Sequence, residues 1–306
     1  MFMKRIILPI LLAMAVLSTT HVSAQQGKHS KVVITGTRFT YPLIEQWVKE
    51  FKKTHPDVVI SLAPLGTPAA DSANLKIVSH DIAASDLKAG ETYVSVAKYG
   101  LLTIANAKSP LVPYYQNKGL QESDVDKLFF TNTPGTFKNY VVYTRQQESC
   151  APTTFASKYG HSFADLSVTK IPGDDKALFN AMKQDSLGIS YNNLGYVYDI
   201  HTRKLNAGIA ILPVDLNRNG KIDADEQFYS TLDDVIKKFE TTTNTLLSAE
   251  EVNLIYSKTS LNGDIQVFLN WVLTEGQQYS HATGFLHFNA DELNKQKLAL
   301  KNNHQN

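Results

Sequence analysis

The chain of 306 residues contains a single cysteine, Cys150, so it cannot form a disulfide within itself. Its fold must be held by core packing, for which a content of 43% hydrophobic residues is adequate. The sequence also lacks an excess of charge of either sign, with 30 Lys and Arg against 29 Asp and Glu. Such a near-neutral chain gives no reason to expect nucleic acid or an anionic membrane as a partner.

Motifs of common catalytic sites are missing as well. The sequence has no G-x-S-x-G element and suggests no histidine partner for its cysteine. The nine histidines do not show the H-x-x-x-H spacing of a metal site, and we expect most of them on the surface. These histidines include His55, His80, His161, His201 and His287. We therefore predict that the chain is not an enzyme.

A long hydrophobic run occurs only at the N-terminus. Lys4 and Arg5 precede the apolar residues 6–17, and Val22-Ser23-Ala24 follows them, which is typical of a secretory signal peptide cleaved near Ala24. The apolar run is too short to span a bilayer. Removal of residues 1–24 leaves 28 basic against 29 acidic residues. We expect a soluble mature protein without membrane insertion, located in the periplasm or secreted.

Strands and helices alternate along the rest of the chain. A buried strand at 32–34, a polar loop at 35–41, an amphipathic helix at 42–51 and a strand at 58–62 form a β-loop-α-β unit. This unit favours a parallel sheet in an α/β fold. Residues 93–106 form an apolar stretch long enough to pass between two lobes. Further strands are predicted at 140–144, 187–191 and 208–214.

Residues 80–86 are predicted to form a short strand that ends in the polar pair Ser85 and Asp86. In open α/β sheets, ligands bind beyond the carboxyl ends of the strands, so both side chains are predicted to face a ligand. The alternative is a turn in which Asp86 only caps the next helix.

The order of these features resembles a family, the type II periplasmic solute-binding proteins, and within it the phosphate-binding proteins of ABC importers. The order and spacing of the matching pieces carry the resemblance, which covers most of the mature chain. The pieces are residues 34–47, 82–86, 145–149 with Phe155, 187–191 and 268–276. The resemblance implies a two-lobed fold with the ligand cleft between the lobes. Lobe 1 is predicted to comprise 30–107 plus 200–302, and lobe 2 to comprise 108–199.

The resemblance also implies that Asp86, Arg145 and Ser149 contact an oxyanion. The loop at 35–41 precedes a helix N-terminus, where free N–H groups favour an anion, and Arg145 offers a bidentate fork. The alternative is that Arg145 pairs with a surface acid such as Glu148. The full set of predicted ligand-binding residues is Arg38, Phe39, Thr67, Ser85, Asp86, Arg145 and Ser149.

A carboxylate that faces an anion repels it unless the anion has a proton to donate, so Asp86 would favour protonated phosphate over fully ionised sulfate. Two stretches depart from the family pattern. Ser149-Cys150-Ala151 stands where the family usually has Ser-Gly-Thr, and residues 65–69 replace a Gly-Ser-rich loop. Arg38 adds a cation near a position that usually carries a hydroxyl. The class of ligand is therefore better defined than its identity.

Residues 215–226 match the pattern of a calcium-binding loop in full, with oxygen ligands at positions 1, 3, 5 and 9, glycine at 6 and glutamate at 12. A strand precedes this loop where an EF-hand has a helix, so we predict an isolated, EF-hand-like loop with a structural Ca²⁺, inserted in lobe 1. The alternative is an Asx-rich turn without metal. The predicted ligands are Asp215, Asn217, Asn219, the carbonyl of Lys221, Asp223 and Glu226.

Together these features predict a monomeric, extracytoplasmic binding protein that captures phosphate or a similar oxyanion for a membrane ABC permease. A second hypothesis is a calcium-stabilised extracellular interaction or adhesion module on the same scaffold, without ligand transport. A third, a hydrolase of phosphate esters, is disfavoured because nucleophile and metal-pair motifs are missing.

Overall fold

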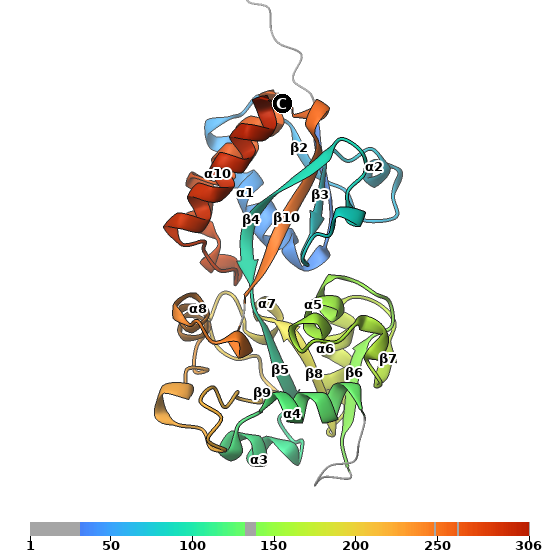
Figure 1. Ribbon diagram of the computed structural model, residues 1–306, viewed down its shortest axis with the longest axis vertical. Helices are drawn as coiled ribbons and strands as arrows, with labels where there is room; N and C mark the ends of the chain where they lie inside the picture. Colours follow the sequence, from blue (N-terminus) through green and yellow to red (C-terminus); the bar gives the residue numbers. More distant parts are fainter. Residues whose placement is uncertain (1–30, 132–138, 248, 262, 306) are drawn as a thin grey trace, which may run out of the picture.

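The computed structural model describes residues 31–131, 139–247, 249–261 and 263–305, so the predicted signal peptide lies outside the described residues. The molecule has two lobes, one above the other in Figure 1, and each is built on a five-stranded mixed sheet with helices around it. The strand order is β2-β1-β3-β10-β4 in lobe 1 and β7-β6-β8-β5-β9 in lobe 2. The predicted two-lobed α/β architecture is confirmed.

In lobe 1, three parallel strands form one side of the sheet, and β10 pairs antiparallel with both β3 and β4. Helix α1 buries Leu43, Ile44, Trp47 and Phe51, the apolar face that the sequence pattern predicts. The elements of this lobe are β1 (Val32–Gly36), α1 (Tyr41–Thr54), β2 (Ile60–Leu62), α2 (Pro68–Asp71), β3 (Leu75–Val78), β4 (Glu91–Tyr99), β10 (Glu250–Ser257), α9 (Gly263–Val272) and α10 (Ala290–Gln305).

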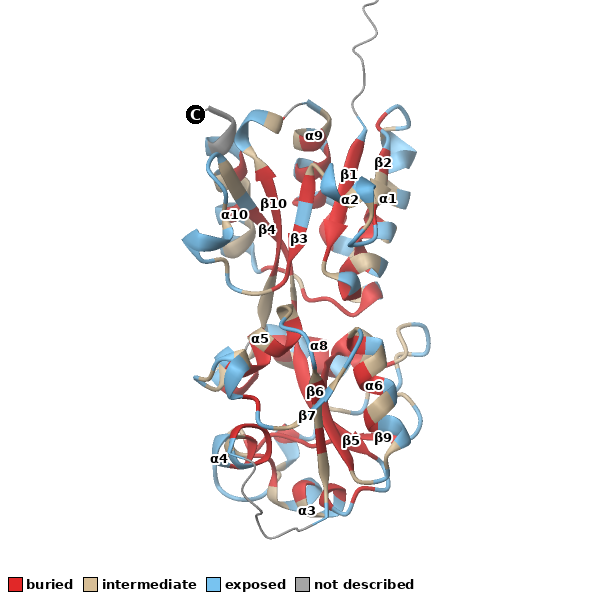
Figure 2. Ribbon diagram, turned by 90° about the vertical axis from the view of Figure 1, so that its right-hand side faces the viewer, coloured by how far each residue is buried: buried red, intermediate tan, exposed pale blue. Residues whose placement is uncertain are grey.

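In lobe 2, β6 pairs parallel with β7 and β8, while β5 pairs antiparallel with β8 and β9. Figure 2 shows buried residues along the central strands of both sheets, such as β1 and β5. The elements of this lobe are β5 (Leu101–Asn106), α3 (Leu111–Lys118), α4 (Glu122–Val125), β6 (Val141–Arg145), α5 (Cys150–Lys158), β7 (Thr169–Ile171), α6 (Asp175–Gln184), β8 (Gly188–Asn193), α7 (Leu194–Val197), β9 (Ile209–Ile211) and α8 (Leu232–Thr241).

Only Gly100 separates β4 from β5, and the chain passes from one sheet to the other at this point (Figure 1). The predicted crossing at 93–106 is therefore confirmed. A Cβ at Gly100 would lie 2.7 Å from the ring of Phe239 on α8, so no larger residue fits this junction without displacing that ring. Across the described ranges, no helix is long and apolar enough to cross a bilayer.

The predicted lobe boundaries are wrong for residues 101–107 and for the chain between 200 and 247. β5 and β9 both belong to the sheet of lobe 2. The wholly buried β9 pairs with β5 along the edge that β8 leaves unpaired. The stretch after β9 stays on this lobe, because the N–H of Leu120 donates to the carbonyl of Pro213 at 2.7 Å. The loop at 215–226 therefore lies in lobe 2, beside α3 and α4.

The predicted strand at 80–86 is also wrong. β3 ends at Val78, and the following residues are mostly exposed and form a short 3-10 helix, Ala84–Asp86. Ile82 is the only large apolar side chain in this segment, which is too little to bury a strand against the sheet.

Candidate functional site

A cavity of about 710 Å³ lies between the two lobes. It is lined by residues that follow the carboxyl ends of β1 and β3 in lobe 1 and of β6 in lobe 2. Ligands of open α/β sheets bind at such strand ends. Of the predicted ligand-binding residues, the structure brings Arg38, Phe39, Arg145 and Ser149 together in this cavity.

The part of the cavity wall that belongs to lobe 1 starts at the end of β1, where the backbone of β1 lies very close to that of β3. Gly36 has φ of +130°, and a Cβ there would lie 2.2 Å from the carbonyl oxygen of Ile77, so glycine is required. The next residues form a short 3-10 helix, Arg38–Thr40. The buried Phe39 ring packs 4.8 Å from that of Tyr99 and anchors this turn, while Arg38 remains exposed on the cavity side.

Arg145 closes the opposite wall, at the end of β6. Its side chain is only 15% exposed; Nε donates to the carbonyl of Gly173 at 3.0 Å, and Nη1 donates to Asp175 Oδ1 at 3.4 Å. Burial raises the pKa of Asp175, against the opposing effect of Arg145. The partner of Arg145 is this carboxylate, 8% exposed, and not the surface acid Glu148 of the alternative interpretation.

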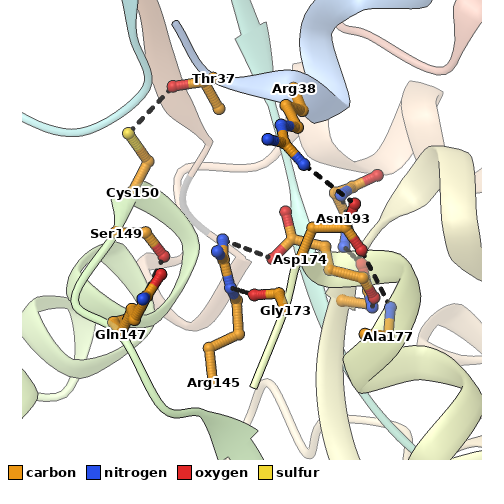
Figure 3. A network of polar contacts seen from close by, with 12 residues as sticks. Thr37, Arg38, Arg145, Gln147, Ser149, Cys150, Gly173, Asp174, Ala177 and Asn193 are labelled. Atoms are coloured by element: carbon orange, nitrogen blue, oxygen red, sulfur yellow. Dashed lines mark hydrogen bonds and ion pairs between the residues drawn. The ribbon is translucent and has the colours of Figure 1, made fainter. Parts of the chain in front are cut away.

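Both cavity arginines reach the same segment of lobe 2. Figure 3 shows Arg38 and Arg145 extending from opposite sides toward Gly173 and Asp174. Arg38 Nη1 lies 3.9 Å from Asp174 Oδ2, a solvent-exposed pair that contributes little stability. The other oxygen of Asp174 accepts the N–H of Ala177 at 3.1 Å and caps α6. A ligand in this cavity therefore meets two guanidinium groups and two carboxylates.

The N-terminus of α5 completes the wall of lobe 2. Ser149 is its N-cap residue, and both Cys150 and Ala151 line the cavity, so the positive end of the helix dipole is directed at it. The Ser149 hydroxyl donates to the carbonyl of Gln147 at 3.4 Å, a long bond that a ligand could replace.

Cys150 has a role in this cavity that the sequence interpretation missed. Its Sγ lies 3.1 Å from Thr37 Oγ1, 3.2 Å from the N–H of Ser79 and 3.3 Å from His80 Nδ1, all three in lobe 1. Burial acts to raise the pKa of the thiol, but the hydrogen bonds with His80, Thr37 and Ser79 lower it overall. The hydrogen bond with Cys150 in turn raises the pKa of His80.

Seventy positions separate Cys150 from His80, so no local motif indicates the pair. The one available signal was the departure at Ser149-Cys150-Ala151, which places a thiol where the family pattern has glycine.

Three predicted ligand-binding residues are not among those that line the cavity. Ser85 and Asp86 lie on the exposed turn after β3, where Asp86 Oδ2 accepts the N–H of Ala83 at 2.8 Å. The carboxylate thus has a local role in its own 3-10 helix; it does not cap a following helix as in the alternative interpretation, because strand β4 comes next. Asp86 reaches the site only indirectly, through His80 Nε2 at 3.9 Å. Thr67 caps α2 through the N–H of Ala70. An anion contact by any of the three stays a prediction that this geometry does not support.

A second polar cluster lies in the loop at 215–226. Its end residues, Asp215 and Glu226, are 0% and 1% exposed. Asp215 accepts the N–H groups of Asn219 at 3.1 Å and Gly220 at 2.7 Å, and it also accepts Gln121 Nε2 at 2.7 Å. These bonds close the first half of the loop around the Asp215 carboxylate.

Glu226 closes the second half in the same way. Its Oε1 accepts the N–H groups of Leu216 at 2.6 Å and Asn217 at 3.1 Å, and its Oε2 accepts that of Asp223 at 2.9 Å. Gly220 has φ of +81°, which permits the sharp turn at position 6. The carboxylate at position 12 is thus held inside the loop.

The remaining predicted ligands converge on Asp223. The side-chain amides of Asn217 and Asn219 donate to its Oδ2 at 2.9 and 2.6 Å, and Lys221 Nζ lies 2.8 Å from its Oδ1. Lys221 and the two amides lower the pKa of Asp223 to about 2. The donor set fits Ca²⁺, because a half-turn of each amide would present its oxygen where its nitrogen now lies. The Lys221 ammonium would have to leave Asp223 for the ion to bind.

No protein-family model and no curated protein sequence matches the chain. Several solved structures share its fold. One is a protein from Clostridium perfringens with bound phosphate, assigned as a phosphate ABC transporter substrate-binding protein; it is 18% identical with a TM-score of 0.61, over 85% of this chain and 100% of that chain. An ABC-type phosphate transport receptor from Vibrio cholerae is 13% identical with a TM-score of 0.58, over 85% and 100%.

The fold is also found outside transport. A peroxide-bound mutant of OxyR from Corynebacterium glutamicum is 10% identical with a TM-score of 0.53, over 86% of this chain and 70% of that chain. The chain therefore has the two-lobed fold of type II periplasmic binding proteins. At these identities the likeness shows the fold alone, and function has to be argued from the site.

Proposed function

We propose that this chain is an extracytoplasmic binding protein that captures a tetrahedral oxyanion, best represented by phosphate, for a membrane ABC permease. The observation that carries the proposal is Arg145, a largely buried guanidinium in the cavity between the lobes, opposite Arg38 and beside the N-terminus of α5. A planar guanidinium can bind two oxygens of an anion at once. Fold neighbours that are described as phosphate-binding proteins support this choice of ligand.

The carboxylates that line the cavity place a second requirement on the ligand, which is that the anion should carry a proton. Asp174 and Asp175 already accompany the two arginines, so a fully ionised anion would meet two carboxylates as well as two cations. Phosphate retains a proton at neutral pH and can donate it to a carboxylate, whereas sulfate cannot. Because Asp175 lines the cavity beside Arg145, we assign the selection of a protonated oxyanion to Asp175 in place of Asp86.

Titration calorimetry of the mature chain with phosphate and with sulfate at pH 7 tests the proposal. We expect phosphate to bind and sulfate to bind at least tenfold more weakly, which corresponds to about 1.4 kcal/mol. A phosphomonoester should not be turned over. Equal binding of the two anions would contradict the role of Asp175, and hydrolysis of the ester would favour the hydrolase hypothesis.

A second candidate function, the interaction or adhesion module without transport, is favoured by one observation. The Cys150 sulfur accepts the N–H of Ser79 and lies within hydrogen-bond distance of Thr37 and His80, so these polar groups already have a partner within the protein. If neither phosphate nor any other small oxyanion binds, this second function is the better explanation of the fold.

For the loop at 215–226 we propose a structural Ca²⁺, held by the side chains of Asp215, Asn217, Asn219, Asp223 and Glu226 and the carbonyl of Lys221. The convergence of these side chains supports it. The ion would supply no chemistry to the cavity, because the two predicted sites share no residue. Its role would be to fix the connection between β9 and α8.

A further inference from the structure

A third polar cluster lies where α8 of lobe 2 meets the segment between α9 and α10. It consists of Glu240, His281 and His287. Glu240 Oε1 lies 2.8 Å from His281 Nε2 and accepts the N–H of His287 at 2.6 Å. The two imidazole rings are stacked, with their centroids 3.7 Å apart. One ligand atom from each residue lies within 4.8 Å of the other two. Neither the cavity nor the calcium loop contains any of these residues.

The side chain of His287 has an unpaired nitrogen that could bind a ligand. Among the residues that the structure describes, its Nε2 is one of four buried side-chain nitrogen and oxygen atoms without a hydrogen-bond partner. A buried polar atom left unpaired is costly, so native proteins usually give it a partner.

We propose that Glu240, His281 and His287 form a binding site for a transition metal ion, best represented by Zn²⁺, with water completing the coordination. Two imidazole nitrogens and one carboxylate suit zinc, whereas calcium and magnesium require oxygen ligands. Zinc would bring the three ligand atoms to about 3.3 Å from one another. The His281 side chain is 36% exposed and can turn out of its stack with His287 to meet the ion.

The position of the site gives it a structural consequence. Leu286, next to His287, exchanges backbone hydrogen bonds with Lys98 of β4, so the histidine is tied to lobe 1. Glu240 belongs to α8 of lobe 2, one residue from Phe239, which packs against Gly100. A bound ion would therefore join the two lobes beside the chain crossing. This site does not depend on the identity of the ligand in the cavity.

The test uses the untagged mature chain, freed of metal, and titrates it with Zn²⁺ by calorimetry; Co²⁺ serves as a spectroscopic probe, because tetrahedral cobalt with nitrogen ligands absorbs visible light. We expect one ion per chain and at least tenfold weaker binding in His281→Gln and His287→Gln. Glu240→Gln should weaken it as well. His201→Gln, which replaces an exposed histidine of lobe 2, should bind like the parent.

Glu226→Gln is the control for the loop at 215–226 and should leave zinc binding unchanged, and a large excess of Ca²⁺ should not displace the zinc. His281→Gln changes a partly exposed side chain and should stay folded by circular dichroism even if His287→Gln does not. The proposal is overturned if the parent fails to bind zinc at micromolar concentration, if His281→Gln and Glu240→Gln bind as tightly as the parent, or if His201→Gln or Glu226→Gln loses as much affinity.

Discussion

The interlobe cavity and the loop at 215–226 bring together similar polar groups in opposite ways. The cavity takes Arg38, His80, Arg145 and Asp175 from four separate segments in two lobes. The loop takes all of its predicted ligands from twelve consecutive residues. The geometry of a site formed by one continuous segment depends mainly on that segment. The geometry of a cavity between lobes depends on where several strands end and on how the two lobes are positioned.

The largest effect is expected in the cavity, from Arg145→Ala. Loss of a desolvated, charge-assisted contact costs about 2–5 kcal/mol, so phosphate binding should weaken by about 30-fold to several thousandfold. The control is Arg218→Ala, because Arg218 pairs with the exposed Glu122 outside the cavity. Titration calorimetry with phosphate compares the affinities of the two variants with that of the parent protein. Normal binding by Arg145→Ala would place the anion elsewhere.

Arg145→Ala also leaves Asp175 buried without its cation, so its stability has to be checked separately. The double variant Arg145→Ala/Asp175→Asn removes this unpaired charge. We expect the double variant to have a melting temperature close to that of the parent and still not to bind phosphate. This result would show that binding is lost because the Arg145 contact is missing and not because the fold is damaged.

The next effect is expected in the loop and should leave the cavity unchanged. Calcium at a hundredfold excess over its dissociation constant stabilises a protein by about 2.7 kcal/mol, which should raise the melting temperature by several degrees. Glu226→Gln should abolish this shift, while Asp225→Asn, an exposed neighbour that is not a predicted ligand, should keep it. A thermal melt with calcium and with chelator measures both. Phosphate affinity should change little with calcium.

A smaller effect separates the two carboxylates that could select the anion. Asp175→Asn should narrow the gap between phosphate and sulfate by roughly tenfold, or about 1.4 kcal/mol, because it removes a repulsive charge beside Arg145. Asp86→Asn should leave the gap unchanged, since Asp86 faces the backbone of Ala83. Competition calorimetry with both anions compares the variants. The reverse result would restore the sequence-based role of Asp86.

The smallest effect concerns the thiol. The pKa of Cys150 is lowered by its neighbours, so its thiolate should persist to lower pH than an ordinary thiol, and the alkylation rate should fall only as pH drops through this lowered value. His80→Gln removes one of the stabilising contacts and should move the midpoint to higher pH. Alkylation rates measured between pH 6 and 10 give both midpoints. Phosphate bound in the cavity should slow the reaction at every pH.

The sequence could predict what depends on local spacing. The amphipathic face of α1, the crossing at 93–106 and the gathering of polar side chains at 215–226 all follow from patterns within a short stretch of chain. Arg145 and Ser149, to which the resemblance to a known family directs attention, both line the cavity, and their contact with an anion stays a prediction.

The sequence could not predict what depends on strand ends and sheet edges. The apolar residues at 82–84 resembled a strand, but β3 had already ended at Val78, so His80 enters the cavity and Asp86 does not. The pairing of β5 with β9 likewise depends on a sheet edge that no local sequence pattern indicates, and it puts both β9 and the loop at 215–226 in lobe 2. The contact of Cys150 with His80 depends on how two lobes meet.

The junction at Gly100 has a mechanical consequence. The chain returns to lobe 1 beside this residue, where Glu250 of β10 pairs with Tyr99 of β4, so both passages between the lobes lie next to each other. The lobes extend far from this point on either side (Figure 1). If the lobes rotate relative to each other about this point, a small rotation near Phe239 displaces the distant ends of both lobes much further than it displaces the residues at the junction. A partner protein that contacts the distant ends of both lobes could therefore respond to the relative position of the lobes without contacting the ligand in the cavity.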